Sequence, residues 1–125
     1  MDRNSQTRVE DVMSTPLETI SPVATVTEAA TVMREHDISA LVVTTSPPSI
    51  VTSTDVLDTV AAGRDPAETA VRDVMTSSVE VVPPDLRLEE VAAMMTRLGI
   101  KHLPVVEGDD YVGMVSSTDV TAQLA

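Results

Sequence analysis

Two short runs of the sequence place a hydroxyl residue three positions before an aspartate. They are Thr52–Asp55 and Ser116–Asp119, and each lies where a β-branched run gives way to helical spacing. A helix N-terminus offers unpaired N–H groups and the positive end of the helix dipole, which favour phosphate. A carboxylate at that place can accept the hydroxyls of a ribose. The same residue types are also favoured helix caps, so the spacing alone leaves capping and ligand binding open.

The two runs belong to a repeat that spans nearly the whole chain. Val9–Met13 aligns with Val71–Met75, and at the same offset Glu18 aligns with Glu80 and Pro22 with Pro84. After a short deletion in the first copy, Val51–Val56 aligns with Val115–Val120. Each copy is too small to bury a good core alone, so we expect the two to pack together with pseudo-twofold symmetry.

Each copy predicts the order strand, helix, strand, strand, helix. A capping box at Thr25–Glu28 opens the first helix of copy one, and Gly99 ends its counterpart in copy two. The other predicted elements are short helical turns at 11–13 and 73–75, strands at 18–20, 79–82, 40–43, 103–106 and 111–115, and last helices at 53–62 and 117–124. The fold class predicted is α/β (α+β), with two βαββα repeats.

This pattern resembles the CBS domain family (cystathionine β-synthase domains), present as a tandem pair. The residues that carry the resemblance are Val71–Thr76, Leu103–Glu107 and Val112–Val120, and it extends over roughly residues 8–124. It implies one repeat at 8–62, a linker at 63–70 and a second repeat at 71–125. It also implies that the two sheets pack into one module with two clefts between the repeats.

The resemblance further implies a regulatory or signalling role rather than catalysis. Its ligands would be adenosyl compounds, namely AMP, ADP, ATP or S-adenosylmethionine, bound as regulatory ligands with no required cofactor. Thr52 with Asp55 and Ser116 with Asp119 match the positions at which the family contacts ribose.

The base and the phosphates would need other side chains. The resemblance places the adenine against aliphatic residues, here Ile20, Val82, Leu103 and Pro104. It places basic residues that reach phosphates at Lys101 and His102, with Arg97 one helical turn away. The alternative for the aliphatic residues is a place in the core, and the alternative for the basic cluster is a solvated surface.

The first copy departs from the second at these positions. Ser39–Val42 stands where the second copy has Lys101–Pro104, so the first copy lacks the charge. Pro47–Ile50 replaces Tyr111–Met114, with Ser49 in place of the glycine that lets a backbone approach closely. Proline cannot donate to a sheet ladder, so this strand is expected to be short or at an edge. The two clefts are therefore not expected to be equivalent.

Composition excludes several classes of function. The 125 residues include 20 Asp plus Glu, 8 Lys plus Arg, no cysteine and one aromatic residue, Tyr111, for a net charge of −12. Thiol chemistry is excluded, and nucleic-acid binding is disfavoured by the charge and by the missing stacking platforms. The acidic, lysine-poor composition favours a halophilic protein over an ordinary acidic one. The two histidines, His36 and His102, show no metal-like spacing.

We expect a cytoplasmic protein, because the polar start Met1–Arg8 has no signal-peptide core and no apolar run could span a membrane. The partners expected are an adenosyl small molecule, a second copy in a homodimer and an unknown effector protein, with no nucleic acid and no membrane. The alternative is a ligand-independent dimerisation or protein-interaction module. A small enzyme is disfavoured because no nucleophile–base pair is evident in the sequence.

Overall fold

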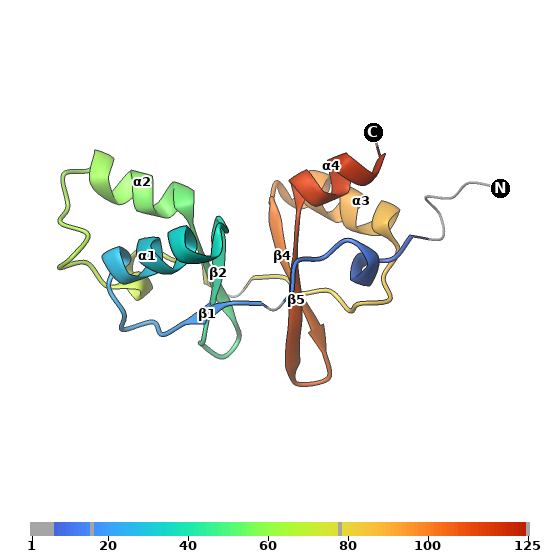
Figure 1. Ribbon diagram of the computed structural model, residues 1–125, viewed down its shortest axis with the longest axis horizontal. Helices are drawn as coiled ribbons and strands as arrows, with labels where there is room; N and C mark the ends of the chain where they lie inside the picture. Colours follow the sequence, from blue (N-terminus) through green and yellow to red (C-terminus); the bar gives the residue numbers. More distant parts are fainter. Residues whose placement is uncertain (1–6, 16, 78, 125) are drawn as a thin grey trace. The chain divides into compact units, whose positions relative to one another are not determined.

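The computed structural model describes residues 7–15, 17–77 and 79–124. The chain forms two compact units (Figure 1). The first-repeat unit is Glu18–Val79, and the second-repeat unit combines Met1–Leu17 with Glu80–Ala125. Within the described residues, no helix is both long and apolar enough to cross a membrane.

The first-repeat unit holds a three-stranded sheet with its helices. Its elements are β1 (Thr19–Ile20), α1 (Val26–His36), β2 (Ala40–Val43), β3 (Ser49–Thr52), α2 (Ser53–Ala61) and a 3₁₀ turn, η3 (Val71–Asp73). The strand order is β1-β2-β3, with β1 parallel and β3 antiparallel to β2. As predicted from the prolines before it, β3 is short, with four residues against seven in its counterpart of the second repeat.

The second-repeat unit repeats this plan with a longer hairpin. Its elements are η2 (Val9–Asp11), α3 (Leu88–Leu98), β4 (His102–Glu107), β5 (Asp110–Ser116) and α4 (Ser117–Leu124). Strands β4 and β5 pair antiparallel, with a register shift between Val105 and Val106. The strand predicted at 79–82 is reduced to one parallel bridge, between Val82 and Val105. Two prolines without N–H groups follow Val82, so the pairing cannot continue.

The helix ends follow local sequence signals. Thr25 Oγ1 accepts a hydrogen bond from the Glu28 N–H at 3.1 Å, which confirms the predicted cap of α1. Gly99 ends α3 at φ 66°, as predicted, in the left-handed region that favours glycine. In α1 that place is taken by Asp37 at φ 53°. Both 3₁₀ turns begin two residues earlier than the predicted helical turns, at Val9 and Val71.

Each unit has a hydrophobic core of its own. In the first-repeat unit the buried cluster is Ala29, Met33, Leu41, Val43, Val51 and Val71. In the second-repeat unit it is Val9, Val82, Leu88, Val91, Met95, Leu103, Val105, Val115 and Val120. Both clusters are aliphatic, as the near absence of aromatic residues requires.

The segment that leads each repeat packs in the unit of the other repeat. Val9, from the start of the first repeat, is fully buried in the second-repeat core. Val71, from the start of the second repeat, is fully buried in the first-repeat core. The compact units therefore differ from the sequence repeats by an exchange of equivalent segments.

Candidate functional site

The strand end of the first repeat is a tight hydrogen-bonded turn. The N–H of Thr52 donates to Oδ2 of Asp55 at 2.8 Å, and the Thr52 hydroxyl reaches the same oxygen at 3.2 Å. Thr52 is the last residue of β3, and Asp55 lies in the first turn of α2. The carboxylate is therefore fixed at the helix N-terminus, with Oδ2 as the oxygen used by the cap.

The strand end of the second repeat has the same design with reciprocal bonds. The N–H of Ser116 donates to Oδ2 of Asp119 at 2.9 Å, and the N–H of Asp119 donates to the Ser116 hydroxyl at 3.2 Å. Both side chains are only partly buried. The helix-cap interpretation is thus correct in both repeats, and the capping geometry holds each carboxylate beside a helix N-terminus, where a ribose or phosphate is favourably bound.

The second strand end also brings two basic residues to Asp119. His102 pairs with Ser116 across the hairpin, and the carbonyl of Lys101 accepts the N–H of Ser117 at 2.8 Å. Burial lowers the pKa of His102, the charge of Asp119 opposes this by raising it, and Lys101 lowers it slightly further. The structure therefore gathers four predicted residues, Lys101, His102, Ser116 and Asp119. Arg97 is exposed in the last turn of α3.

The corresponding place in the first repeat has the same backbone without the charge. Ala40 pairs with Thr52, and the N–H of Ser53 donates to the carbonyl of Ser39 at 2.9 Å. Asp55 instead lines a pocket of about 210 Å³ in the first-repeat unit, together with Asp58, Thr59, Ala62, Arg64 and Val74. The two strand ends therefore offer different electrostatic surroundings.

The aliphatic residues predicted to meet a base lie mainly inside the cores. Leu103 is fully buried and Val82 is 2% exposed. Pro104 is also buried, and its carbonyl accepts the N–H of Val82 at 3.0 Å. Ile20 is half-buried and packs against the first-repeat core. Of the four, Ile20 therefore offers the most accessible side chain.

The leading segment of the first repeat contacts the hairpin of the second repeat at Gly113, which the sequence did not predict. Met13 and Ser14 lie against Gly113, and the backbone groups of Ser14 and Met114 exchange hydrogen bonds of 2.8 and 3.1 Å. The glycine of this hairpin was expected to allow a close approach, and the structure identifies the approaching segment. Where the first repeat has Ser49 instead, the serine is 1% exposed and its hydroxyl lies 2.6 Å from that of Thr45.

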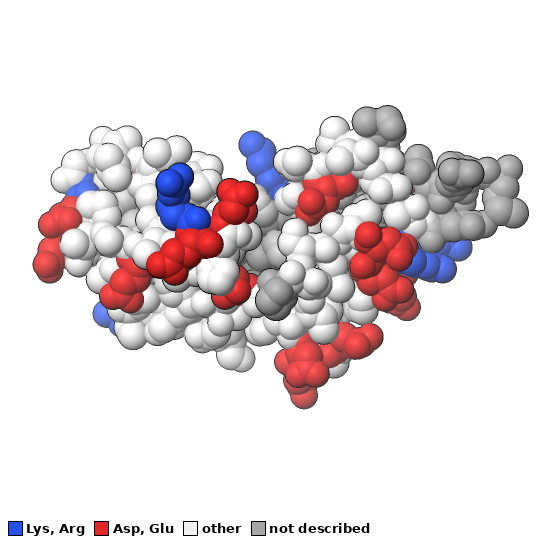
Figure 2. Space-filling model, viewed as in Figure 1, with Lys and Arg blue, Asp and Glu red and all other residues white. Residues whose placement is uncertain are grey.

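The acidic character of the surface is evident, with Asp and Glu side chains over both units and few Lys or Arg in view (Figure 2). Among the described residues, no group of three or more His, Asp or Glu side chains is arranged to hold a metal ion.

Comparison with known proteins identifies the family. The sequence matches the CBS domain over residues 9–62 and 71–125. It is 34% identical over 115 residues to the CBS domain-containing protein YhcV of Bacillus subtilis, which covers 90% of this chain and 81% of that protein.

Solved structures agree with this match. The hexameric CBS-CP12 protein from bloom-forming cyanobacteria has a TM-score of 0.87 at 32% identity, covering 92% of this chain and 69% of that one. The CBS domain pair of protein MJ0100, solved with 5′-methylthioadenosine and S-adenosyl-L-methionine, has a TM-score of 0.83 at 27% identity, covering 94% and 95% of the two chains. The chain therefore belongs to the CBS domain family and carries a pair of these domains.

Proposed function

We propose that this CBS pair is a regulatory, non-catalytic module that binds an adenosyl ligand and responds by changing its assembly or its contacts with a partner protein. The observation that carries the proposal is the strand-end arrangement present in both repeats. In each, a carboxylate is held by the backbone N–H of a hydroxyl residue three positions earlier. The MJ0100 pair, bound to 5′-methylthioadenosine and S-adenosyl-L-methionine, supports an adenosyl compound as the ligand.

In this proposal Asp55 and Asp119 accept the ribose hydroxyls, with Thr52 and Ser116 beside them. The capping bonds use Oδ2 of each carboxylate, so Oδ1 is the oxygen that we assign to the ligand. Ile20 supplies the accessible aliphatic contact for the base. In the second-repeat unit Val82, Leu103 and Pro104 are buried, so we assign them to the core of that unit rather than to direct contact with a base.

The phosphates of AMP, ADP or ATP would bind at Lys101 and His102, because these are the basic residues gathered at a strand end. A phosphate dianion beside His102 favours the imidazolium, so binding a nucleotide would take up a proton when the imidazole starts neutral. The first repeat offers no such charge at Ser39 and Ala40, so its strand end suits an adenosyl ligand without phosphates. We place this module in the cytoplasm, where adenine nucleotides are plentiful.

The test is calorimetric titration with AMP, ADP, ATP and S-adenosylmethionine, in dilute buffer and in molar KCl. We expect saturable binding of at least one ligand, weakened by Asp119→Asn or Asp55→Asn. The matched controls are Thr118→Ala and Thr54→Ala, which change exposed hydroxyls in the same two turns. Binding of none of the four ligands at millimolar concentration would overturn the proposal.

One observation favours a ligand-independent interaction module as the second candidate. Leu57 and Val60 on α2 are 68% and 57% exposed. Leu57 also lines a pocket of about 320 Å³ between α1 and α2, together with Ala30, Met33, Arg34, Asp37, Ile38, Ser53 and Val56.

The occupant we assign to this pocket is Leu57 of a second copy. A twofold dimer pairs a patch with itself, and Arg34 beside Asp37 on the rim makes the patch complementary to itself in charge. Leu57→Ser should then dissociate a homodimer whose mass does not respond to nucleotide. A monomeric parent chain would exclude this candidate.

A further inference from the structure

Each compact unit binds a short segment from the start of the other repeat, and the two bound segments have nearly the same sequence. The surface that binds each segment is called its groove. In the second-repeat unit the occupant is residues 7–14, and in the first-repeat unit it is residues 69–76. The two occupants share the pattern Val-x-Asp-Val-Met followed by a hydroxyl residue. Because each unit takes its occupant from the other repeat, neither groove is filled by the repeat that forms it.

Five backbone hydrogen bonds hold the occupant of the second-repeat unit. Val9 donates to the carbonyl of Leu86 at 2.9 Å, Glu10 donates to Pro84 at 3.0 Å, and Leu88 donates to Thr7 at 2.9 Å. The other two are the exchanged pair between Ser14 and Met114, at 2.8 and 3.1 Å. The occupant is thus bound along its whole length by main-chain groups.

The first-repeat unit binds its occupant through the same five bonds. Val71 donates to Ala24 at 2.8 Å, Arg72 to Pro22 at 2.9 Å, and Val26 to Thr69 at 2.9 Å. Ile50 and Thr76 exchange a pair at 2.9 and 2.8 Å. The same arrangement of bonds therefore occurs with a segment that precedes its unit in the sequence and with one that follows it.

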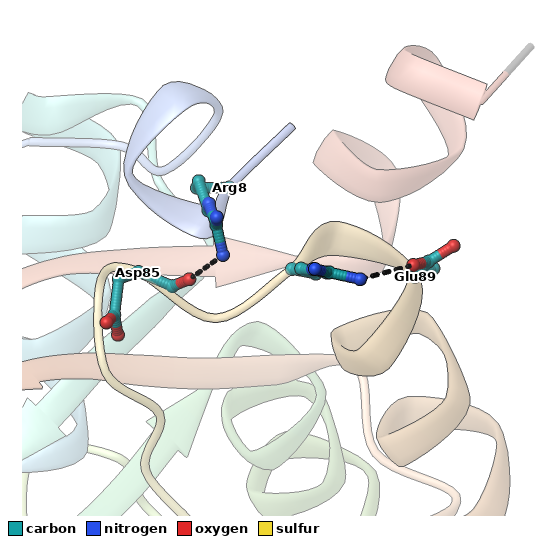
Figure 3. Close-up of polar contacts among 4 residues, drawn as sticks. Arg8, Asp85 and Glu89 are labelled. Atoms are coloured by element: carbon teal, nitrogen blue, oxygen red, sulfur yellow. Dashed lines mark hydrogen bonds and ion pairs between the residues drawn. The ribbon is translucent and has the colours of Figure 1, made fainter. Parts of the chain in front are cut away.

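Side chains complete the recognition in the second-repeat groove. Val9 is fully buried in the core, and Met13 fills the space left by the missing side chain of Gly113. Arg8 Nη1 donates to the carbonyl of Asp85 at 2.9 Å, so the segment is also held at its rim (Figure 3). Arg87, whose side chain is 50% exposed, forms an ion pair with Glu89 at 3.9 Å.

We propose that the second-repeat groove is an interchain binding site, whose second occupant is residues 7–14 of another copy of this chain. Each of these main-chain and side-chain bonds can form equally with a segment from the same chain or from another copy. The exchange needs no new surface, as in other domain swaps. The chain's own segment competes at an effective concentration in the millimolar range, so occupancy by another copy should rise with protein concentration.

Exchange of the segment between copies does not depend on nucleotide binding. The ligand test above can fail while the groove still exchanges segments, and the groove can fail to exchange while the ligand binds.

The geometry around Arg8 and Arg87 permits a direct test. They face each other in an antiparallel bridge, with the bonds of Val9 and Leu88 on either side. Such a non-hydrogen-bonded pair has Cα atoms about 4.5 Å apart, within the range of a disulfide. Because the chain has no cysteine, any disulfide formed after substitution is the one introduced.

The experiment mixes two full-length chains of different tag size, one with Arg8→Cys and the other with Arg87→Cys, under mild oxidation. The expected product is a heterodimer joined between positions 8 and 87, identified by peptide mapping, whose yield rises with concentration. Adding Val9→Asp to the Arg8→Cys chain should abolish it. The double variant Arg8→Cys/Arg87→Cys should form the disulfide within one chain, which would establish that positions 8 and 87 are close enough to be joined.

A matched mixture controls for random collision. Arg97 is also exposed, and it lies at the other end of the 11-residue helix α3, about 15 Å from its start. Arg8→Cys mixed with Arg97→Cys should therefore give no comparable heterodimer. The proposal is overturned if the double variant closes within one chain while the Arg8–Arg87 mixture gives no heterodimer. It is also overturned if the Arg97 mixture gives as much, or if the heterodimer survives Val9→Asp.

Discussion

Met13 occupies the space that a side chain at Gly113 would need. A Cβ built on Gly113 would lie 2.7 Å from Sδ of Met13 and 2.9 Å from the backbone oxygen of Ser14. Gly113 lies in β5, directly before the residue whose backbone exchanges hydrogen bonds with Ser14. The glycine therefore permits the close docking of the leading segment on this strand.

Gly113→Ala should accordingly lower the free energy of unfolding by about 1–3 kcal/mol, the usual cost of overpacking. The Met13 side chain can turn aside, whereas the backbone of Ser14 cannot move without losing its bonds to Met114. Urea unfolding of the full chain measures the effect. In the double variant with Met13→Ala, the loss should be smaller than the sum of the two single losses. Additive losses would show that Met13 and Gly113 do not interact.

The pKa of His102 predicts how stability changes with pH. Burial lowers this pKa in the folded chain below its ordinary value of 6.5. Between the folded pKa and pH 6.5, the unfolded chain therefore binds more protons than the folded chain. The contribution of neutral His102 to the free energy of unfolding should therefore be fully present above pH 6.5. It should be lost as the pH falls from 6.5 toward the pKa of His102 in the folded chain. His102→Gln should flatten this part of the profile, measured by urea unfolding between about pH 5 and pH 8.

Two neighbours of His102 shift its pKa in opposite directions, so substituting them should change the loss of stability at acid pH in opposite directions. Asp119 raises the pKa of His102, so Asp119→Asn should lower that pKa and deepen the acid loss. Lys101 lowers it, so Lys101→Gln should make the acid loss smaller. Equal profiles for the two variants would contradict the assignment of His102 as the group responsible.

Much of the fold could be predicted because its signals are local. The cap at Thr25, the left-handed end at Gly99 and the turn after Glu107 all depend on neighbouring residues. The exchange of leading segments could not be predicted in the same way. Val9–Met13 and Val71–Met75 are nearly the same sequence, so comparing the two repeats does not say which unit each segment packs in.

The position of the candidate site could be predicted from the sequence, but the roles of its aliphatic residues could not. The hydroxyl–carboxylate spacing located both strand ends, and the pairing of His102 with Ser116 follows from the hairpin. The burial of Leu103 could not be separated in advance from contact with a base, since both need an aliphatic residue. Its complete burial in the core now favours a structural role for that side chain.

The caps at the strand ends predict a stability cost that is separate from any ligand. Asp55→Ala removes the acceptor of two hydrogen bonds from Thr52, and Asp119→Ala removes the acceptor for Ser116. Each should lower the free energy of unfolding by about 0.5–2 kcal/mol without ligand. Asp58→Ala, at an exposed position on the same helix as Asp55, is the control and should change it little. A control that costs as much would show that the loss is not due to capping.

The net charge of −12 predicts that salt stabilises the folded chain. Among the described residues, His36 lies 3.4 Å from Glu18 and Arg87 lies 3.9 Å from Glu89. With 20 Asp plus Glu against 8 Lys plus Arg, repulsion among the carboxylates outweighs their attraction to basic groups. The screening length falls from about 30 Å at 0.01 M salt to about 3 Å at 1 M. The melting temperature should therefore rise over this range of KCl. Because screening depends on ionic strength, NaCl should act like KCl, and an uncharged osmolyte should not reproduce the steep early rise. A melting temperature that is flat or falls with salt would show that repulsion among the carboxylates does not limit the stability of this fold.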